Sequence, residues 1–305
     1  MAGSGVITTS AHPKALWPGV HAWFGRDYEE YEAEYTDLVD VETSDKAYEE
    51  EVESTGFGLA TVKPQGTAVT YDTDSQGYTK RYTHVMYSTG YICTEEEIED
   101  NQYEAVSKKR AGEVAFALRQ TKENVVALLY IRAFTSGYNG GDGVVLCSTS
   151  HPTIYGNQSN RLTANADISE AAIEDLCIQI SQAKNARGLV MRLMPKTIHV
   201  STWQAFDTAR ILKSVLQNDT ALNAVNVLKA MNAIPGGIKV SHYFTSDSAW
   251  FIRTNVKHGM KLFQRRKVQF VRDNDFGSSN ALAKGSERYS AGHSDWRATY
   301  GTPGV

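Results

Sequence analysis

The chain has few cysteines and no long hydrophobic run. Its three cysteines, Cys93, Cys147 and Cys177, are widely spaced and odd in number, which argues against a disulfide framework and for a reducing cytoplasmic compartment. The longest strictly apolar run, Val125–Ile131, is far shorter than a membrane-spanning helix, so we expect no membrane association. Residues 1–14 have neither a basic start nor an apolar stretch, which predicts no signal peptide.

The common signatures of catalytic, phosphate-binding and metal sites are also missing. The sequence has no P-loop, no G-x-G-x-x-G, no G-x-S-x-G, no H-E-x-x-H and no C-x-x-C. Asp72–Gly77 begins like a calcium loop, but Thr83 stands where the bidentate glutamate belongs. His151-Pro152 follows a serine-rich stretch, and we interpret it as a turn. These absences remove the positive reasons to propose an enzyme, and we expect no catalytic residue, cofactor or metal.

Composition is that of a folded protein, but the charges are unevenly distributed. With 41% hydrophobic and 22% charged residues and a net charge of −4, no overall basicity points to nucleic acid. Residues 27–53 hold thirteen acidic residues and one lysine, whereas residues 253–297 hold ten basic and four acidic residues. The two segments are expected to attract each other, within a subunit or between subunits. Two solvated surfaces are the alternative.

A long helical register is the most informative feature that is present. It runs without proline from Thr94 to Thr135, with Glu97 at the capping-box spacing from Thr94 and apolar residues at helical intervals. An unbroken helix of this length spans about 63 Å, whereas a compact globule of this size is roughly 50 Å across. The pattern therefore predicts a protruding or flat subunit that lies against its own copies. Two shorter helices, broken near Asn101–Gln102, are the alternative.

The residues before this helix predict an arm, a helix and a hairpin, and the hairpin needs a further surface to pack on. Residues 1–25 are expected to form an extended arm, and residues 27–41 a helix with a tyrosine stripe. Thr67–Tyr71 and Tyr78–Tyr87 have strand composition, and the turn-rich residues between them predict a hairpin. A hairpin alone is marginal in water, so another subunit is a candidate support. Later strands of the same chain are the alternative.

The remainder predicts a small α/β layer followed by strands. Residues 168–184 form an amphipathic helix pattern that Asp167 can cap. Helices are also expected over residues 202–216 and 221–231. Strands are expected at residues 144–147, 197–200, 238–243, 250–254, 261–263, 268–272 and 295–300.

This order of elements resembles the Hong Kong 97-like major capsid proteins of tailed phages, and more locally the major head subunits of Mu-like phages. The resembling segments are Gly66–Asp72 with Gly77, Gly90–Glu96, Gly141–Gly143 through Leu146–Pro152, and Trp296–Tyr300. The resemblance implies an α+β fold. Its parts would be an N-terminal arm (1–55), an extended hairpin loop (56–93), a peripheral domain with a long spine helix (94–184), an axial α/β domain (185–254) and a return to the peripheral domain (255–305).

The resemblance also implies a function and partners. The chain would be a major capsid protein that self-assembles, through pentamers and hexamers, into an icosahedral shell around double-stranded DNA, without sequence specificity. A separate scaffolding protein, a maturation protease and a portal protein would be its other partners, and virions would be assembled in the host bacterial cytoplasm. The alternatives are an encapsulin-like nanocompartment shell and a cytoplasmic enzyme with a site in residues 185–254.

Subunit contacts are expected at arm aromatics, at the hairpin and at a short basic cluster. Extended arms and hairpins gain burial only on assembly, and many weak contacts sum over a closed shell. The basic cluster is either the exposed edge of a strand or a non-specific phosphate contact. The candidates are Trp17, Trp23, Tyr28, Tyr31, Tyr71, Asp72, Tyr78, Lys80, Arg81, Arg265, Arg266 and Lys267.

Overall fold

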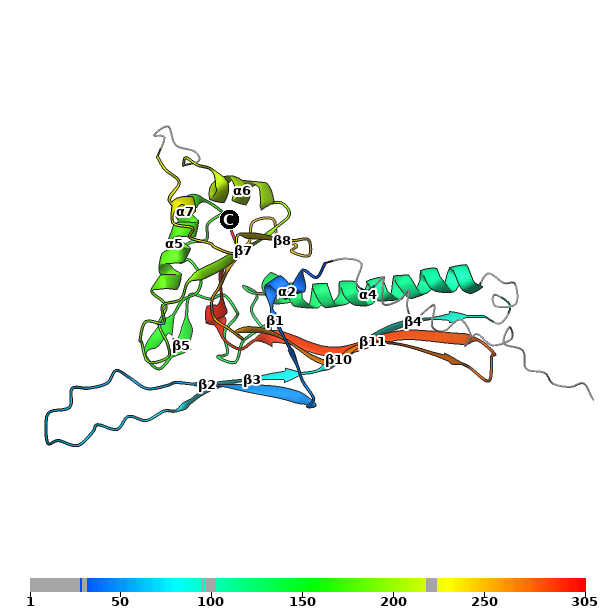
Figure 1. Cartoon of the computed structure of the whole chain (residues 1–305), viewed down its shortest axis with the longest axis horizontal. Helices are drawn as coiled ribbons and strands as arrows, with labels where there is room; N and C mark the ends of the chain where they lie inside the picture. The colour runs from blue at the N-terminus through cyan, green and yellow to red at the C-terminus, as the bar shows by residue number, and fades with distance from the viewer. Residues whose placement is uncertain (1–27, 29–31, 95, 97–102, 218–223) are drawn as a thin grey trace, which may run out of the picture. The chain divides into compact units, whose positions relative to one another are not determined.

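The structure is a computed structural model that describes residues 28, 32–94, 96, 103–217 and 224–305 (Figure 1). It contains two compact units. Of the described residues, the first unit comprises those within 28–33, 84–124 and 264–289, and the second those within 34–83, 125–263 and 290–305. Each unit is thus built from segments that are far apart in the sequence.

Residues 103–124 of the long helix α4 (Tyr103–Ile131) belong to the first unit, where the helix packs on a β-sheet, and its last turns belong to the second unit. β4 (Val85–Cys93) pairs with β11 (Ala281–His293), and β11 lies next to β10 (Met260–Asn274). Small and branched side chains at helical spacing bury one face of α4 against this sheet. The packed residues are Ala111, Val114, Ala115 and Leu118 of the helix with Phe270 and Ala283 of the strands.

The predicted long helix is confirmed over Tyr103–Ile131 but ends four residues early. Ala133 and Thr135 donate to carbonyls three residues back, so the last turn tightens and the helix stops. At the other end, Thr94 has no regular structure and Glu96 is helical. The expected first turns, and the alternative break near Asn101–Gln102, lie outside the described residues.

The second unit contains a mixed four-stranded sheet in the order β12-β9-β7-β8. β7 (Pro195–Ser201) runs parallel to β8 (Ile238–Ser241) and antiparallel to β9 (Trp250–Thr254), which pairs antiparallel with β12 (Thr299–Thr302). The helices α5 (Glu170–Ser181), α6 (Ala205–Lys213) and α7 (Val227–Ala230) belong to the same unit. The predicted α/β layer is therefore confirmed.

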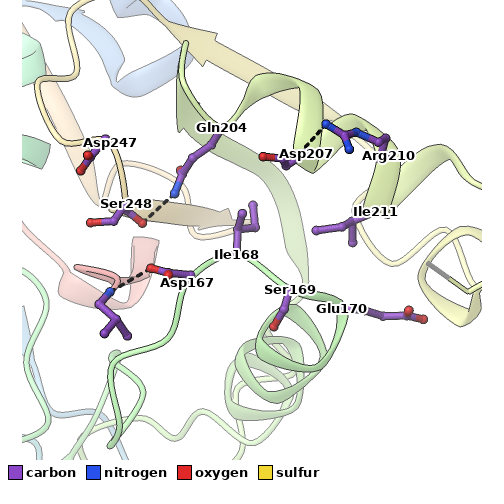
Figure 2. A pocket seen from close by; sticks show the side chains of 11 residues that line it. Asp167, Ile168, Ser169, Glu170, Gln204, Asp207, Arg210, Ile211, Asp247 and Ser248 are labelled. Atoms are coloured by element: carbon purple, nitrogen blue, oxygen red, sulfur yellow. Dashed lines mark hydrogen bonds and ion pairs between the residues drawn. The ribbon is translucent and has the colours of Figure 1, made fainter. Parts of the chain in front are cut away.

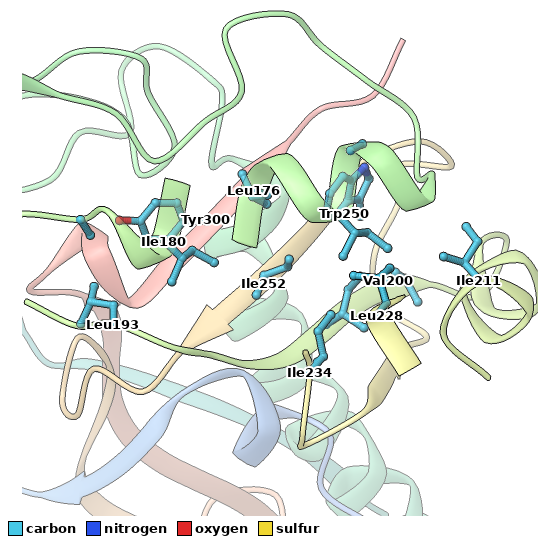
Figure 3. Packing of buried hydrophobic residues seen from close by; sticks show 14 residues of the cluster. Leu176, Ile180, Leu193, Val200, Ile211, Leu228, Ile234, Trp250, Ile252 and Tyr300 are labelled. Atoms are coloured by element: carbon cyan, nitrogen blue, oxygen red, sulfur yellow. The ribbon is translucent and has the colours of Figure 1, made fainter. Parts of the chain in front are cut away.

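Both faces of β7 and β9 are covered, because alternate side chains along each strand pack on opposite sides of the sheet. Ile198, Val200, Trp250 and Ile252 face a core that includes Leu176 of α5 (Figure 3). The intervening Phe251 and His199 lie on the opposite side, where the ring of Phe251 meets that of Tyr130 edge-on, 5.2 Å between centroids. The central strands are therefore buried on two sides.

A hairpin forms in the second unit, but with other strands than predicted (Figure 1). β2 (Tyr48–Ser54) pairs with β3 (Gln76–Thr83), and residues 55–75 form the loop between them. The prediction of a strand at Thr67–Tyr71 was wrong. β2 was missed because it is largely glutamate, and its alternate glutamates are inward-facing and paired with cations.

The predicted strand Tyr78–Tyr87 is in fact two strands interrupted at His84. Its second part pairs with β11 within the chain, which is the alternative in which later strands complete the sheet. β11 itself was not predicted, because glycines and polar residues interrupt its apolar pattern. Residues 261–263 and 268–272 are parts of the single strand β10.

Several smaller predictions also need correction. Residues 27–41 do not form one helix: the short α2 (Tyr35–Leu38) is followed by β1 (Asp40–Thr43). Ser169, not Asp167, caps α5, because its side chain accepts from the Ala172 N–H. Residues 144–147 form only an isolated bridge, from Val145 to Asn139.

Two expected elements near the middle and the end of the chain are shorter than predicted. Helix 202–216 is reduced to α6, and of the helix 221–231 only α7 is found among the described residues. Residues 295–300 are the turn η3 (Trp296–Ala298) leading into β12. His151 is not in a turn, since it starts β5 (His151–Thr153), which pairs with β6 (Gly156–Gln158).

Candidate functional site

The β2–β3 hairpin is anchored on its own unit by polar side chains, of which Tyr82 is buried and Tyr78 and Lys80 are partly buried. The Tyr78 hydroxyl donates to the Ser294 carbonyl at 3.2 Å, and the Tyr82 hydroxyl lies 2.5 Å from Ser294 Oγ. Lys80 Nζ donates to the Asn139 carbonyl at 3.1 Å. Burial raises the pKa of both tyrosines and lowers the pKa of Lys80. The base of the hairpin is therefore fixed by contacts within the chain.

Acidic residues of the N-terminal segment pair with basic residues of the C-terminal segment inside one subunit. Lys261, which is buried, contacts Glu51 of β2 and lies 3.4 Å from Glu42. Arg297 Nη1 lies 3.5 Å from Glu53 Oε1. The uneven charge distribution predicted an attraction either within a subunit or between subunits. These ion pairs lie within one subunit.

The loop between β2 and β3 is closed at its base by carboxylates. Asp74 accepts from Ser54 Oγ at 2.7 Å and from the Gly56 N–H at 2.8 Å. Further out, Asp72 accepts from the Gly58 N–H at 2.7 Å and lies 3.8 Å from Arg187. The Ser54 hydrogen bond chiefly lowers the pKa of Asp74, and the Gly58 N–H that of Asp72. The two carboxylates therefore organise the loop while ionised.

The outer part of this loop exposes apolar side chains. Leu59, Val62 and Tyr71 are 80%, 94% and 91% exposed. Phe57 and Val69 are also exposed, which makes five apolar side chains in one short segment. An organised loop that presents this much apolar surface is typical of an interaction site.

A buried polar cluster in the same unit was missed by sequence reasoning. His151 Nδ1 lies 2.6 Å from Asp142 Oδ2, and its Nε2 lies 3.0 Å from Asn160 Oδ1. The Asn160 amide is oriented by its NH₂ group, which donates to three carbonyls, those of Leu146, Trp296 and Thr299. Nε2 of His151 therefore carries a proton.

The neighbours of this cluster fix its chemistry. Burial opposes ionisation of Asp142, but the hydrogen bond and charge of His151 outweigh it and lower the carboxyl pKa. The indole of Trp296 stacks on the imidazole, 4.3 Å between centroids. Every polar atom of the ring is used inside the fold, so the cluster is built for structure. The Gly141–Gly143 and His151-Pro152 segments were the available signal.

The remaining predicted contact residues are scattered. Trp17, Trp23 and Tyr31 lie outside the described residues. Tyr28 lies in the first unit, where its hydroxyl accepts from Lys122 Nζ at 2.8 Å and donates to Glu287. Arg81 is half-exposed, 3.7 Å from Glu50 Oε1, with its guanidinium over the ring of Tyr48.

The basic cluster on β10 is not uniformly exposed. Arg266 donates to Ser286 Oγ at 2.9 Å, and Arg265 is partly buried, whereas Lys267 is exposed. Only part of the cluster is therefore open to an anion. β10 is an inner strand of its sheet, in the order β1-β10-β11-β4, so the cluster does not lie on an edge strand.

Two further properties of the described residues bear on function. No group of three or more histidine, cysteine or acidic side chains in the described ranges is arranged to hold a metal ion. None of the described helices combines the length and the apolar composition needed to cross a membrane.

Solved structures resemble this chain over most of its length. The virus-like particle of Pyrococcus furiosus shares 11% identity, with a TM-score of 0.55, and covers 93% of this chain and 98% of its own. The native GTA particle capsid shares 12% identity with a TM-score of 0.55, covering 88% of each chain. The capsid of Myoviridae phage XM1 shares 11% identity with a TM-score of 0.52, covering 87% of this chain and 90% of its own. These likenesses confirm the predicted α+β, Hong Kong 97-like fold.

The family follows from the sequence itself. No curated protein matches the chain. A family model described as phage capsid protein matches residues 77–301, which is well over half of the chain. The matched range begins in the β2–β3 hairpin and includes α4, the mixed sheet and the buried His151 cluster. By this match, the chain belongs to the phage capsid protein family.

Proposed function

We propose that this capsid protein is the major head subunit of a tailed phage, and that copies of it close a shell through the loop of residues 55–75. The observation that carries the proposal is the organised, apolar and exposed loop. Burying a side chain of this size contributes about 1.5–3 kcal/mol. Five such side chains per subunit, repeated over a closed shell, are enough to make the loop a principal adhesive.

The family favours a phage head over the encapsulin-like alternative, because the matching model describes phage capsid proteins. Within this proposal, residues 55–75 are the outer part of the extended loop expected at residues 56–93, of which residues 85–93 instead pair with β11 as β4. The helix α4 is the spine helix, and residues 185–254 are the axial part around fivefold and sixfold positions. Double-stranded DNA inside the shell, a separate scaffolding protein, a maturation protease and a portal protein complete the proposed assembly. Assembly in the host cytoplasm and the Mu-like subfamily are also proposals, and the subfamily rests on the sequence motifs.

Negative-stain electron microscopy of the purified full chain tests the proposal. We expect closed shells, or rings of five or six subunits, from the chain alone or co-expressed with its scaffolding protein. A monodisperse monomer under both conditions would contradict it.

A further inference from the structure

A pocket of about 520 Å³ lies in the second unit, among the beginnings of α5 and α6, the residues before β9 and Val305 (Figure 2). It is separate from the loop of residues 55–75, and neither the fold nor the family assigns it a ligand. Its walls carry four carboxylates, those of Asp167, Glu170, Asp207 and Asp247.

The polar groups of this pocket are mainly hydrogen-bond acceptors. Its one lining cation, Arg210, already pairs with Asp207 at 2.7 Å. One Asp167 oxygen accepts from the Val305 N–H at 2.9 Å. The Ser248 hydroxyl donates to the Pro303 carbonyl. An anion would therefore meet repulsion, and a ligand rich in donors would meet acceptors.

Gln204 adds an acceptor that lacks a donor. Its side chain lines the pocket and the residue is 7% exposed. The amide orientation is set because Nε2 donates to the Ser248 carbonyl at 2.7 Å. Oε1 is then buried with no hydrogen-bond partner in the described part of the chain. A buried acceptor without a donor is costly, and a bound N–H group would satisfy it.

The pocket also has an apolar wall, formed by Ile168 and Ile211. Such a wall suits the methylene groups of a cation on an aliphatic stem. A metal ion fits less well, since no described group of three or more acidic, histidine or cysteine side chains is arranged to hold one.

We propose that this pocket binds an organic cation, a guanidinium or primary ammonium group on a short aliphatic stem. Two sources supply that chemistry: a lysine or arginine side chain of a neighbouring copy, or a free polyamine. In either case the carboxylates hold the charged group and Gln204 Oε1 accepts one of its N–H groups.

Calorimetric titration of the full chain with agmatine, which carries both cationic groups, tests this proposal. We expect one agmatine per unassembled chain. Asp247→Asn and Glu170→Gln should each weaken binding about fivefold, the size of a partly exposed ion pair. Asp175→Asn, on α5 but outside the pocket, is the matched control and should bind like the parent. Inorganic phosphate should not bind.

Assembled shells distinguish the two sources. If shells no longer take up agmatine, a neighbouring copy fills the pocket; if they do, the pocket serves a free cation. Absence of binding to unassembled chain, or equal binding by the two pocket variants and the control, would overturn the proposal. Because the first titration does not require assembly, its failure is distinguishable from a failure of the shell proposal.

Discussion

The Asp74 carboxylate accepts a hydrogen bond from the Gly56 N–H at 2.8 Å and thereby joins the two ends of the loop of residues 55–75. Gly56 has a φ of +69°, a backbone conformation that favours glycine. Asp74 also accepts from Ser54 Oγ, so the loop leaves β2 and returns to β3 at a defined place. This closure fixes both ends of the segment that carries the exposed apolar side chains.

Asp74→Ala should loosen the base of the loop without unfolding the subunit, because the mixed sheet lies elsewhere. We expect faster hydrogen exchange at the Gly56 amide and less efficient shell assembly, measured by sedimentation. Asp74→Asn retains one acceptor oxygen and should be intermediate. Unchanged exchange in the alanine variant would show that Asp74 does not hold the loop.

The triple variant Leu59→Ser, Val62→Ser, Tyr71→Ser should fold normally and fail to form shells. All three side chains are exposed, so the midpoint of thermal unfolding should stay within about 2 °C of the parent's. Circular dichroism and electron microscopy check the two halves of the prediction. The control Leu59→Met, Val62→Ile keeps the apolar surface and should assemble. Normal shells from the serine variant would remove the loop from the adhesive surface.

Lys261→Met tests whether the acid–base contacts stabilise the single subunit. The change removes the buried cation that Glu51 and Glu42 share. We expect a loss of about 2 kcal/mol in the free energy of unfolding, measured by denaturant titration of unassembled subunits. Lys267→Met, at an exposed position of the same strand, is the control and should change stability little. A subunit of unaltered stability whose shells dissociate would instead place this charge pairing between subunits.

Asn160→Ala should be among the most destabilising single changes. It leaves three carbonyls and the Ser148 N–H without their amide partner and removes the acceptor for His151. A loss of about 3 kcal/mol or more in the free energy of unfolding is expected. Asn165→Ala, which removes an exposed contact to Arg161, is the control. A mild effect at position 160 would mean that water or other donors replace the amide.

Stability should fall on acidification because His199 is buried in its neutral form. Burial, with the positive charges of Arg253 and Lys239, lowers the pKa of His199 to about 3. The unfolded chain titrates near its ordinary value of about 6.5. Below that pH the unfolded state binds more protons, so the free energy of unfolding decreases as pH falls from 6.5 toward 3.

His199→Gln should flatten this part of the pH profile while lowering stability at pH 7, because the ring's contact with Thr197 is altered. Thermal unfolding at several pH values measures both effects. A variant with the same acid slope as the parent would assign that slope to other groups. His293 is one such group, since burial lowers its pKa to about 4.

Sequence reasoning predicted the helices and strands that carry a clear apolar pattern in their own residues. The periodicity of α4 and α5 and the apolar strands β7 and β9 were sufficient, because one face of each helix and most residues of each strand are buried. The family motifs predicted the fold as a whole. Helix caps and helix ends were predicted less well, since Ser169 caps α5 where Asp167 was expected.

Elements held by distant polar contacts were not predictable in the same way. β2 is a strand because Glu51 and Glu53 find cations from the far end of the chain. His151 is buried because Asp142 and Asn160 satisfy both of its ring nitrogens. These distant partners leave no pattern in the neighbouring sequence. The glutamates of β2 therefore suggested a solvated surface, and His151-Pro152 suggested a turn.

A cryo-electron microscopy map of the assembled shell is the most direct measurement of the central claim. The account predicts that residues 55–75 of one subunit lie on an adjacent copy, with Leu59, Val62 and Tyr71 buried in the contact. A closed shell in which this loop projects into solvent, touching no neighbour, would contradict it.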